Sequence, residues 1–158
     1  MFSQLRKISS NQNSWDLSKY RYFMPYQTRW RDDGENKSIQ NSVYMSATGN
    51  IIMSFQNKLK NANHLQQHNV EMAFESRGDI GHPTLMLAGL GVERLGNTSV
   101  VYKVGVFKPF CDFHVNLDRF GEFPHQPTMA SLEKKYEGRA VAVMRAVNVF
   151  IEDGKPTV

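Results

Sequence analysis

The sequence has almost no cysteine: Cys111 is the only one among 158 residues. A single thiol excludes an internal disulfide framework and a zinc site built from several cysteines, and it favours a reducing compartment. A lone thiol of this kind is expected to be buried. The sequence also lacks any apolar run of the roughly 20 residues that a membrane-spanning helix needs. We therefore expect no membrane span.

Charge is moderate and slightly basic, with 19 Lys and Arg against 15 Asp and Glu, a net charge of +4. The basic residues are scattered, and they concentrate locally only at Lys58/Lys60, Lys134/Lys135 and Arg139. A nucleic-acid site would gather Lys and Arg on one face, so a solvated basic surface explains this pattern better. The length and the 41% hydrophobic content predict one globular domain with a single core.

The first twenty residues differ in composition from the rest. They contain Arg6 and Lys7, many Ser, Asn and Gln, and no acid before Asp16. This composition favours a flexible or targeting tail over residues 1–20, and a mitochondrial presequence is the targeting alternative. We therefore expect a folded domain over residues 21–158, in the cytoplasm or alternatively in the mitochondrion.

Hydrophobic periodicity predicts five strands within that domain. The aromatic-rich segment 22–30 and the alternating segment 70–75 are typical of strands. Two further runs flank Gly96-Asn97, a two-residue hairpin signal, and a valine-rich run ends the series. The predicted strands cover residues 22–30, 70–75, 85–94, 99–107 and 141–151.

One long helix is predicted between the first two strands. It should start at Asn41 or Ser42, either of which can cap it through a short side-chain oxygen. Apolar residues then recur every three or four positions and form one stripe: Tyr44, Ala47, Thr48, Ile51, Phe55 and Leu59. Met45, Ile52 and Met53 widen the stripe, so we expect the helix to be covered on most of its sides.

The segment that joins the first strand to the helix resembles the opening signature of hotdog-fold thioesterases. In that family a strand reads R-W-x-D-x-D, and the chain turns through G-H-V-N-N into a helix that begins near a Tyr. Counted from Trp30, three residues fall at the family's spacing: Asp32, Asn41 and Tyr44.

Two more motifs, in the family's order, extend the resemblance over most of the predicted domain. Residues 92–102 look like its V-E-R-L-G-x-S-S-x-x-Y hairpin, and residues 147–156 are similar to its last strand and closing G-x-P turn. Residues 110–138 match nothing in the family and are predicted to be an insertion, with a short helix over 129–136. The resemblance implies an α+β hotdog fold, in which an antiparallel sheet is wrapped around one long central helix.

The resemblance also implies a reaction. Family members hydrolyse thioesters with a carboxylate that activates water or attacks the carbonyl carbon, while backbone N–H groups at the start of the central helix hold the oxyanion. In this sequence Gly34 holds the position of the catalytic carboxylate, and Lys37 and Ser38 replace the family's Gly-His pair. Gln40 stands at its first Asn. The active-site motif is therefore degenerate.

Neighbouring residues supply candidates for the missing acid. A one-residue slip would bring the carboxylate of Asp33 or Glu35 inward, and Asn36 matches the Asn of plant-type acyl-carrier thioesterases. These three are the candidate catalytic residues. The candidate substrate-binding residues are Asp32, Asn41 and Tyr44. The first of these has an ordinary alternative role, in which its carboxylate accepts loop N–H groups in an Asx turn.

No metal or cofactor is expected. His64 and His68 have the four-residue spacing that places two imidazoles on one helical face. No acid or third ligand lies beside them in the sequence, so they are better interpreted as surface histidines than as zinc ligands.

Two functions follow from the resemblance. The first is a thioesterase-like protein that acts on or binds acyl thioesters, carried by coenzyme A or by an acyl carrier protein. The alternative is a catalytically inactive hotdog protein with an acyl-binding or structural role in a complex. Because hotdog domains pair with one another, the resemblance also implies a homodimer or a higher homo-oligomer.

Overall fold

The computed structural model of the protein describes residues 12–29, 34, 39–58, 66–81, 84–111, 117–118, 121–152 and 155–156. The described part of the chain begins with two short 3-10 helices, η1 (Gln12–Trp15) and η2 (Leu17–Lys19). The remaining elements are β1 (Tyr22–Gln27), α3 (Asn41–Lys58), β2 (Gln66–Ser76), β3 (Leu85–Leu95), β4 (Ser99–Phe107), α4 (Met129–Lys135), β5 (Ala142–Glu152) and β6 (Lys155–Pro156). None of the described helices is long and apolar enough to cross a membrane.

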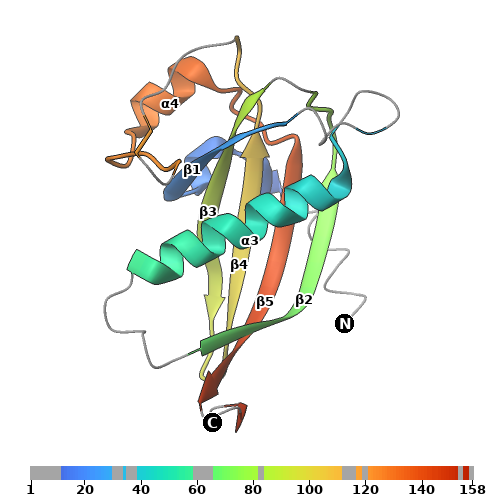
Figure 1. The fold of residues 1–158 in the computed structure, drawn as a ribbon, viewed down its shortest axis with the longest axis vertical. Coiled ribbons are helices and arrows are strands. Elements are labelled where there is room, and N and C mark those ends of the chain that lie inside the picture. The colour runs from blue at the N-terminus through green and yellow to red at the C-terminus, as the bar shows by residue number, and fades with distance from the viewer. Residues whose placement is uncertain are drawn as a thin grey trace.

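The strands form one antiparallel sheet in the order β1-β3-β4-β5-β2, with β6 paired to the end of β5. The long helix α3 crosses one face of this sheet (Figure 1). The predicted α+β hotdog fold, with an antiparallel sheet around one long helix, is confirmed. Among the predicted strand boundaries, the largest error is at the start of β2, which begins four residues earlier than predicted. Its first residues are polar, but they still pair with β5.

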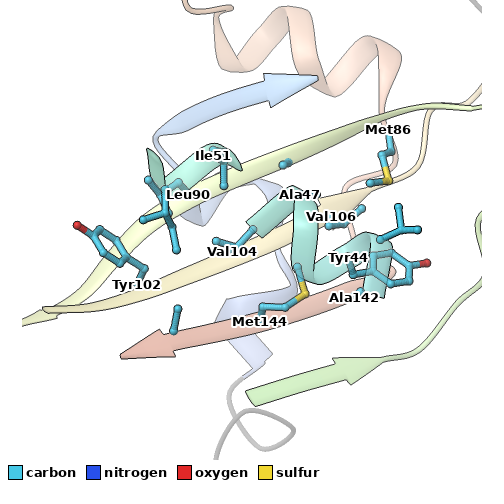
Figure 2. Packing of buried hydrophobic residues seen from close by; sticks show 14 of the residues in the cluster. Tyr44, Ala47, Ile51, Met86, Leu90, Tyr102, Val104, Val106, Ala142 and Met144 are labelled. Carbon is cyan, nitrogen blue, oxygen red and sulfur yellow. The ribbon is translucent and has the colours of Figure 1, made fainter. Parts of the chain in front are cut away.

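The helix α3 packs against the sheet through one apolar face (Figure 2). The buried residues of this face are Val43, Tyr44, Ala47, Thr48, Ile51, Ile52 and Ser54. Burying one side chain such as Ile51 contributes roughly 1.5–3 kcal/mol, so this face accounts for most of the helix's stability. The expectation that α3 is covered on most sides is wrong, because Met45 and Met53 are 43% and 63% exposed. A single sheet covers only one side of a helix.

The sequence of α3 is unusual for a helix that reaches solvent, because Lys58 at its end is its only charged residue. Gly49 lies in its middle, where an added Cβ would meet nothing within 4 Å. Helix propensity and surface ion pairs therefore contribute little here, and packing on the sheet must hold the helix.

The opposite face of the sheet carries a second core, which we call the rear cluster. Its sheet residues alternate along the strands with those that face α3, as the two-residue period of a strand requires. Its members are Trp15, Leu17, Tyr20, Phe23, Ala73, Leu87, Phe107, Leu132, Tyr136, Ala140 and Val143. The short helices η1 and η2, and α4 at the upper left of Figure 1, supply the covering side chains.

The sequence predicts a flexible or targeting tail over residues 1–20. For residues 12–20 this prediction is wrong. Trp15, Leu17 and Tyr20 are 1%, 2% and 0% exposed, so residues 12–20 belong to the folded domain. The guanidinium carbon of Arg77 lies 4.1 Å from the centre of the Trp15 ring, which adds a cation–π contact. Polar residues surround these three side chains in the sequence, so no apolar periodicity indicates that they are buried.

The segment that follows residue 117 lies along β1 and the rear cluster. The helix predicted over residues 129–136 is confirmed as α4, and the Thr128 hydroxyl caps it by accepting the Ser131 N–H at 3.2 Å. Phe123 and Met129 are half-buried against the rear cluster. That residues 110–138 are an insertion stays a prediction.

Candidate functional site at the start of the central helix

The structure describes only part of the site that the sequence predicts. Asp32, Asp33, Glu35 and Asn36 lie outside the described residues, and Gly34 is half-buried. Two substrate-binding candidates, Asn41 and Tyr44, lie near the start of α3. Asn41 is exposed, whereas Tyr44 is buried at 2% exposure.

The helix starts earlier than a capping role for Asn41 or Ser42 requires. Asn41 is already the first helical residue, so both lie inside α3, and Gln40 is the residue that precedes it. The Val43 N–H donates to the Gln40 carbonyl at 3.0 Å. No acidic side chain lies in the first turn, so the positive end of the helix dipole is not neutralised from within α3. This helix end can therefore attract a negative group.

The connection between β2 and β3 lies against this helix start. The Ile39 N–H donates to the Ile80 carbonyl at 2.7 Å, and the Ile80 side chain is fully buried. Gly78 is held in turn by a bond from its N–H to the Val141 carbonyl at 3.2 Å. Backbone hydrogen bonds therefore fix the turn that contains Asp79 beside the entry to α3.

Tyr44 joins the helix to this turn. Its ring lies 5.5 Å from that of Phe74 on β2. Burial and, to a smaller extent, the negative charge of Asp79 raise the pKa of the Tyr44 hydroxyl to about 12, while a backbone hydrogen bond from Ile80 acts in the opposite direction. Asp79 is thus an exposed carboxylate close to the start of α3. Sequence reasoning missed it, and its only signal was the Gly78-Asp79 turn between two predicted strands.

Tyr44 should make stability depend on pH in the alkaline range. Its folded-state pKa of about 12 exceeds the ordinary 10.0, so its contribution is full below pH 10.0 and is lost as the pH rises through 12. We expect the melting temperature to fall over this window, and less steeply in Tyr44→Phe. Burial also raises the pKa of Tyr20 and of Tyr136, so part of the fall should persist. An unchanged alkaline profile in Tyr44→Phe would contradict this assignment.

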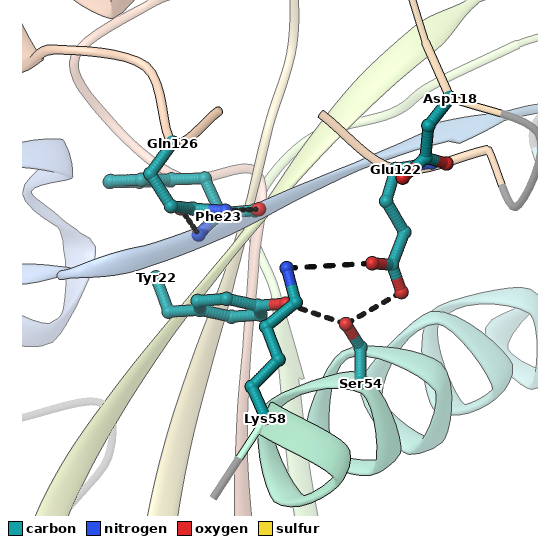
Figure 3. Close-up of polar contacts among 7 residues, drawn as sticks. All are labelled: Tyr22, Phe23, Ser54, Lys58, Asp118, Glu122 and Gln126. Carbon is teal, nitrogen blue, oxygen red and sulfur yellow. Dashed lines mark hydrogen bonds and ion pairs between the residues drawn. The ribbon is translucent and has the colours of Figure 1, made fainter. Parts of the chain in front are cut away.

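A second polar cluster lies at the other end of α3 (Figure 3). The Tyr22 hydroxyl and the Ser54 Oγ are 2.6 Å apart, and Ser54 donates to a Glu122 carboxylate oxygen at 2.7 Å. Lys58 Nζ lies 3.6 Å from the other oxygen of Glu122. The Tyr22 hydroxyl and the Glu122 carboxylate both raise the pKa of Lys58, against the opposing effect of burial.

This cluster is not part of the helix-start site. Ser54 is thirteen residues beyond Asn41, which at 1.5 Å per residue separates them by roughly 20 Å. Its contacts join β1, α3 and the segment after residue 117, so the cluster anchors that segment. No sequence motif indicates this cluster, because Glu122 falls in the stretch that matches nothing in the family.

His68 lies in β2 and is exposed, as expected of a surface histidine, and His64 lies outside the described residues. One expectation about a single residue is wrong. Cys111 is exposed, contrary to the expected buried thiol. Within the described ranges, no group of three or more His, Cys, Asp or Glu could hold a metal ion.

No protein-family model matches the sequence, and no curated protein matches it. Solved structures do match the fold. The PA5185 protein of Pseudomonas aeruginosa is 22% identical, with a TM-score of 0.65 over 89% of this chain and 85% of that one. A thioesterase of Thermus thermophilus, complexed with coenzyme A and zinc, is 15% identical, with a TM-score of 0.63 over 87% and 90%. The DHNA-CoA thioesterase of Staphylococcus aureus is 13% identical, with a TM-score of 0.59 over 86% and 78%.

Proposed function

Because the chain has the hotdog fold of these thioesterases, we propose that it binds acyl thioesters at the start of α3 and hydrolyses them. The thioester would be carried by coenzyme A or by an acyl carrier protein. The observation that carries this proposal is the start of α3 itself, which has no acid in its first turn and lies beside buried Tyr44. A polarised thioester carbonyl has the negative charge that such a helix end favours.

The catalytic carboxylate must come from outside the helix, because α3 contains no Asp or Glu. Asp33 or Glu35 would activate a water molecule or attack the carbonyl carbon directly, with Asn36 beside them. In the first case water adds to the carbonyl carbon, the carbon–sulfur bond breaks, and the thiolate takes up the proton that the carboxylate accepted. Asp32, Asn41 and Tyr44 would hold the substrate, and Asp79 is a further carboxylate within the described chain.

The second candidate function is acyl binding without turnover. Three residues favour it, because Gly34, Lys37 and Ser38 replace the reactive side chains of the family's motif. An inactive protein would keep the helix start and lose only the hydrolytic step.

A thiol-release assay on short and long acyl-CoAs and on an acyl carrier protein tests the proposal. If Asp33 or Glu35 is the acid, the double variant Asp33→Ala, Glu35→Ala should lower kcat/KM by about 100-fold or more. Asp79→Asn tests the other carboxylate, and Glu133→Ala on the exposed surface of α4 is the matched control. Hydrolysis undiminished in the double variant would remove Asp33 and Glu35 from the mechanism. Binding of acyl-CoA without thiol release by the wild type would establish the second function.

We also propose a homodimer or a higher homo-oligomer, in the cytoplasm or alternatively in the mitochondrion. The location of β2 at one end of the sheet supports self-pairing, because an edge strand presents unpaired backbone groups. The exposed thiol of Cys111 supports a reducing compartment.

A further inference from the structure

The outer edge of β1 is occupied by a side chain. The Phe23 N–H donates to Gln126 Oε1 at 2.8 Å, and Gln126 Nε2 donates to the Phe23 carbonyl at 3.0 Å (Figure 3). These two bonds use both backbone groups of one residue, as a neighbouring antiparallel strand would. The side-chain amide of Gln126 therefore takes the place of a strand at this point of the edge.

Pro25 closes the next position on the same edge. Backbone groups in an antiparallel strand alternate between its two sides, so residue 25 faces the same way as Phe23. Proline has no N–H to donate to an added strand. Two successive outward positions of β1 are thus unavailable to another strand. The backbone groups of Phe23 are already bonded to Gln126, and Pro25 has no N–H to donate.

Contacts of the residues that precede Gln126 hold it against β1. Glu122 is bonded to Ser54 and paired with Lys58 of α3, and the Glu122 N–H donates to Asp118 Oδ1 at 3.0 Å. Phe123 packs on the rear cluster. The Gln126 side chain itself is exposed, where water competes for its bonds, so it contributes little to stability. Gln126 is therefore important for blocking the edge of β1 and not for the free energy of unfolding.

We propose that Gln126 closes the β1 edge of the sheet against a strand from a second copy of this chain. A second copy of the chain has a strand that fits this role. Its β2 is an 11-residue strand at the other end of the sheet, and it would be the strand that pairs with an open β1 edge. In the part of the chain that the structure describes, no segment pairs with the outer edge of β2.

The geometry explains why one closed edge matters. If both edges were open, β2 of one copy could pair with β1 of the next, and this head-to-tail contact repeats without closing. With β1 closed, only two β2 edges can meet, and such a pair is complete after two copies. Gln126 would therefore limit sheet-mediated association and prevent open-ended growth.

The variants Gln126→Ala and Gln126→Ala, Pro25→Val test this proposal, with exposed His125→Ala as the matched control. The first removes the amide, and the second also restores the missing backbone donor. We expect the Phe23 amide to exchange its hydrogen about five- to tenfold faster in Gln126→Ala, as the loss of about one net hydrogen-bond energy predicts. Sedimentation velocity over a range of concentrations should show species larger than those of the wild type, and more of them in the double variant.

Each result decides the proposal. Faster exchange together with larger species, neither of which occurs in His125→Ala, supports it. Faster exchange with wild-type sedimentation in both variants would overturn it, because an opened edge would then recruit no second copy. Unchanged exchange at Phe23 would also overturn it, because Gln126 would not be closing the edge. Thioester hydrolysis, measured in parallel, should stay at the wild-type level in Gln126→Ala, since Gln126 lies outside the helix-start site.

Discussion

Replacing Trp15 with alanine should lower the free energy of unfolding by about 3–5 kcal/mol, the range for removing a large aromatic side chain from a core. Trp15 is the last residue of η1, and its side chain is 1% exposed and packs in the rear cluster. The substitution would leave a cavity there and would remove the ring that the Arg77 guanidinium covers. Because a domain of this size has a stability of only about 5–15 kcal/mol, the loss should be visible as a large fall in melting temperature.

Chemical denaturation monitored by circular dichroism measures this effect without relying on tryptophan fluorescence. Ser18→Ala is the matched control, because Ser18 lies in the neighbouring helix η2 and is exposed. We expect the control to change stability by less than about 0.5 kcal/mol. If Trp15→Ala unfolded at the same denaturant concentration as Ser18→Ala, residues 12–20 would not hold the rear face of the sheet.

Gly105→Ala should destabilise the protein by about 3 kcal/mol through overpacking of the same cluster. A Cβ at position 105 would lie 2.8–2.9 Å from the Cζ, Cε2 and Oη atoms of Tyr20. The Tyr20 ring cannot move aside easily, because it is fully buried and packs edge-on against Phe107 at 5.6 Å. Its hydroxyl also donates to the Ser14 carbonyl, so a shift of the ring would break that bond.

A double-mutant cycle separates this clash from other effects of the substitution. In the Tyr20→Ala background the methyl group enters an empty space, so Gly105→Ala should cost much less there than in the wild type. Gly138→Ala is the control, since an added Cβ at that position meets nothing within 4 Å. Equal costs of Gly105→Ala in both backgrounds would show that Tyr20 is not the group that the methyl meets.

The elements with strong periodicity could be predicted from the sequence. The strand predicted over residues 99–107 matches β4, and a hairpin joins it to β3. Its turn lies one residue later than predicted, at Asn97-Thr98, because the Gly96 N–H donates to the Ser99 carbonyl at 2.8 Å. The apolar, β-branched runs of these strands and the turn residues that bound them are local signals in the sequence. The short helices η1 and η2 could not be predicted in the same way. Their apolar residues find partners only across the sheet, far along the chain.

The candidate site was less predictable than the fold. The family's motif locates the start of α3, and the structure confirms a helix that begins at Asn41. Contacts between distant segments left no signal in the sequence. Ser54 and Glu122 are 68 residues apart, and Phe23 and Gln126 are 103 apart. Their pairing depends on how the segment after residue 117 returns to β1, which no local pattern specifies.

The absence of charge along α3 has a consequence for how the chain folds. A segment with glycine at its centre, many Ser and Asn residues and no i,i+4 ion pairs forms little helix in isolation, because nucleation is unfavourable and propagation weak. The helix must then form together with the strands that bury it, such as β3 and β4, which follow much later in the sequence. Contacts of such long range make the transition state slow to assemble. We therefore expect α3 to form together with the sheet and not ahead of it, so that substitutions on its buried face would change the folding rate little compared with the unfolding rate.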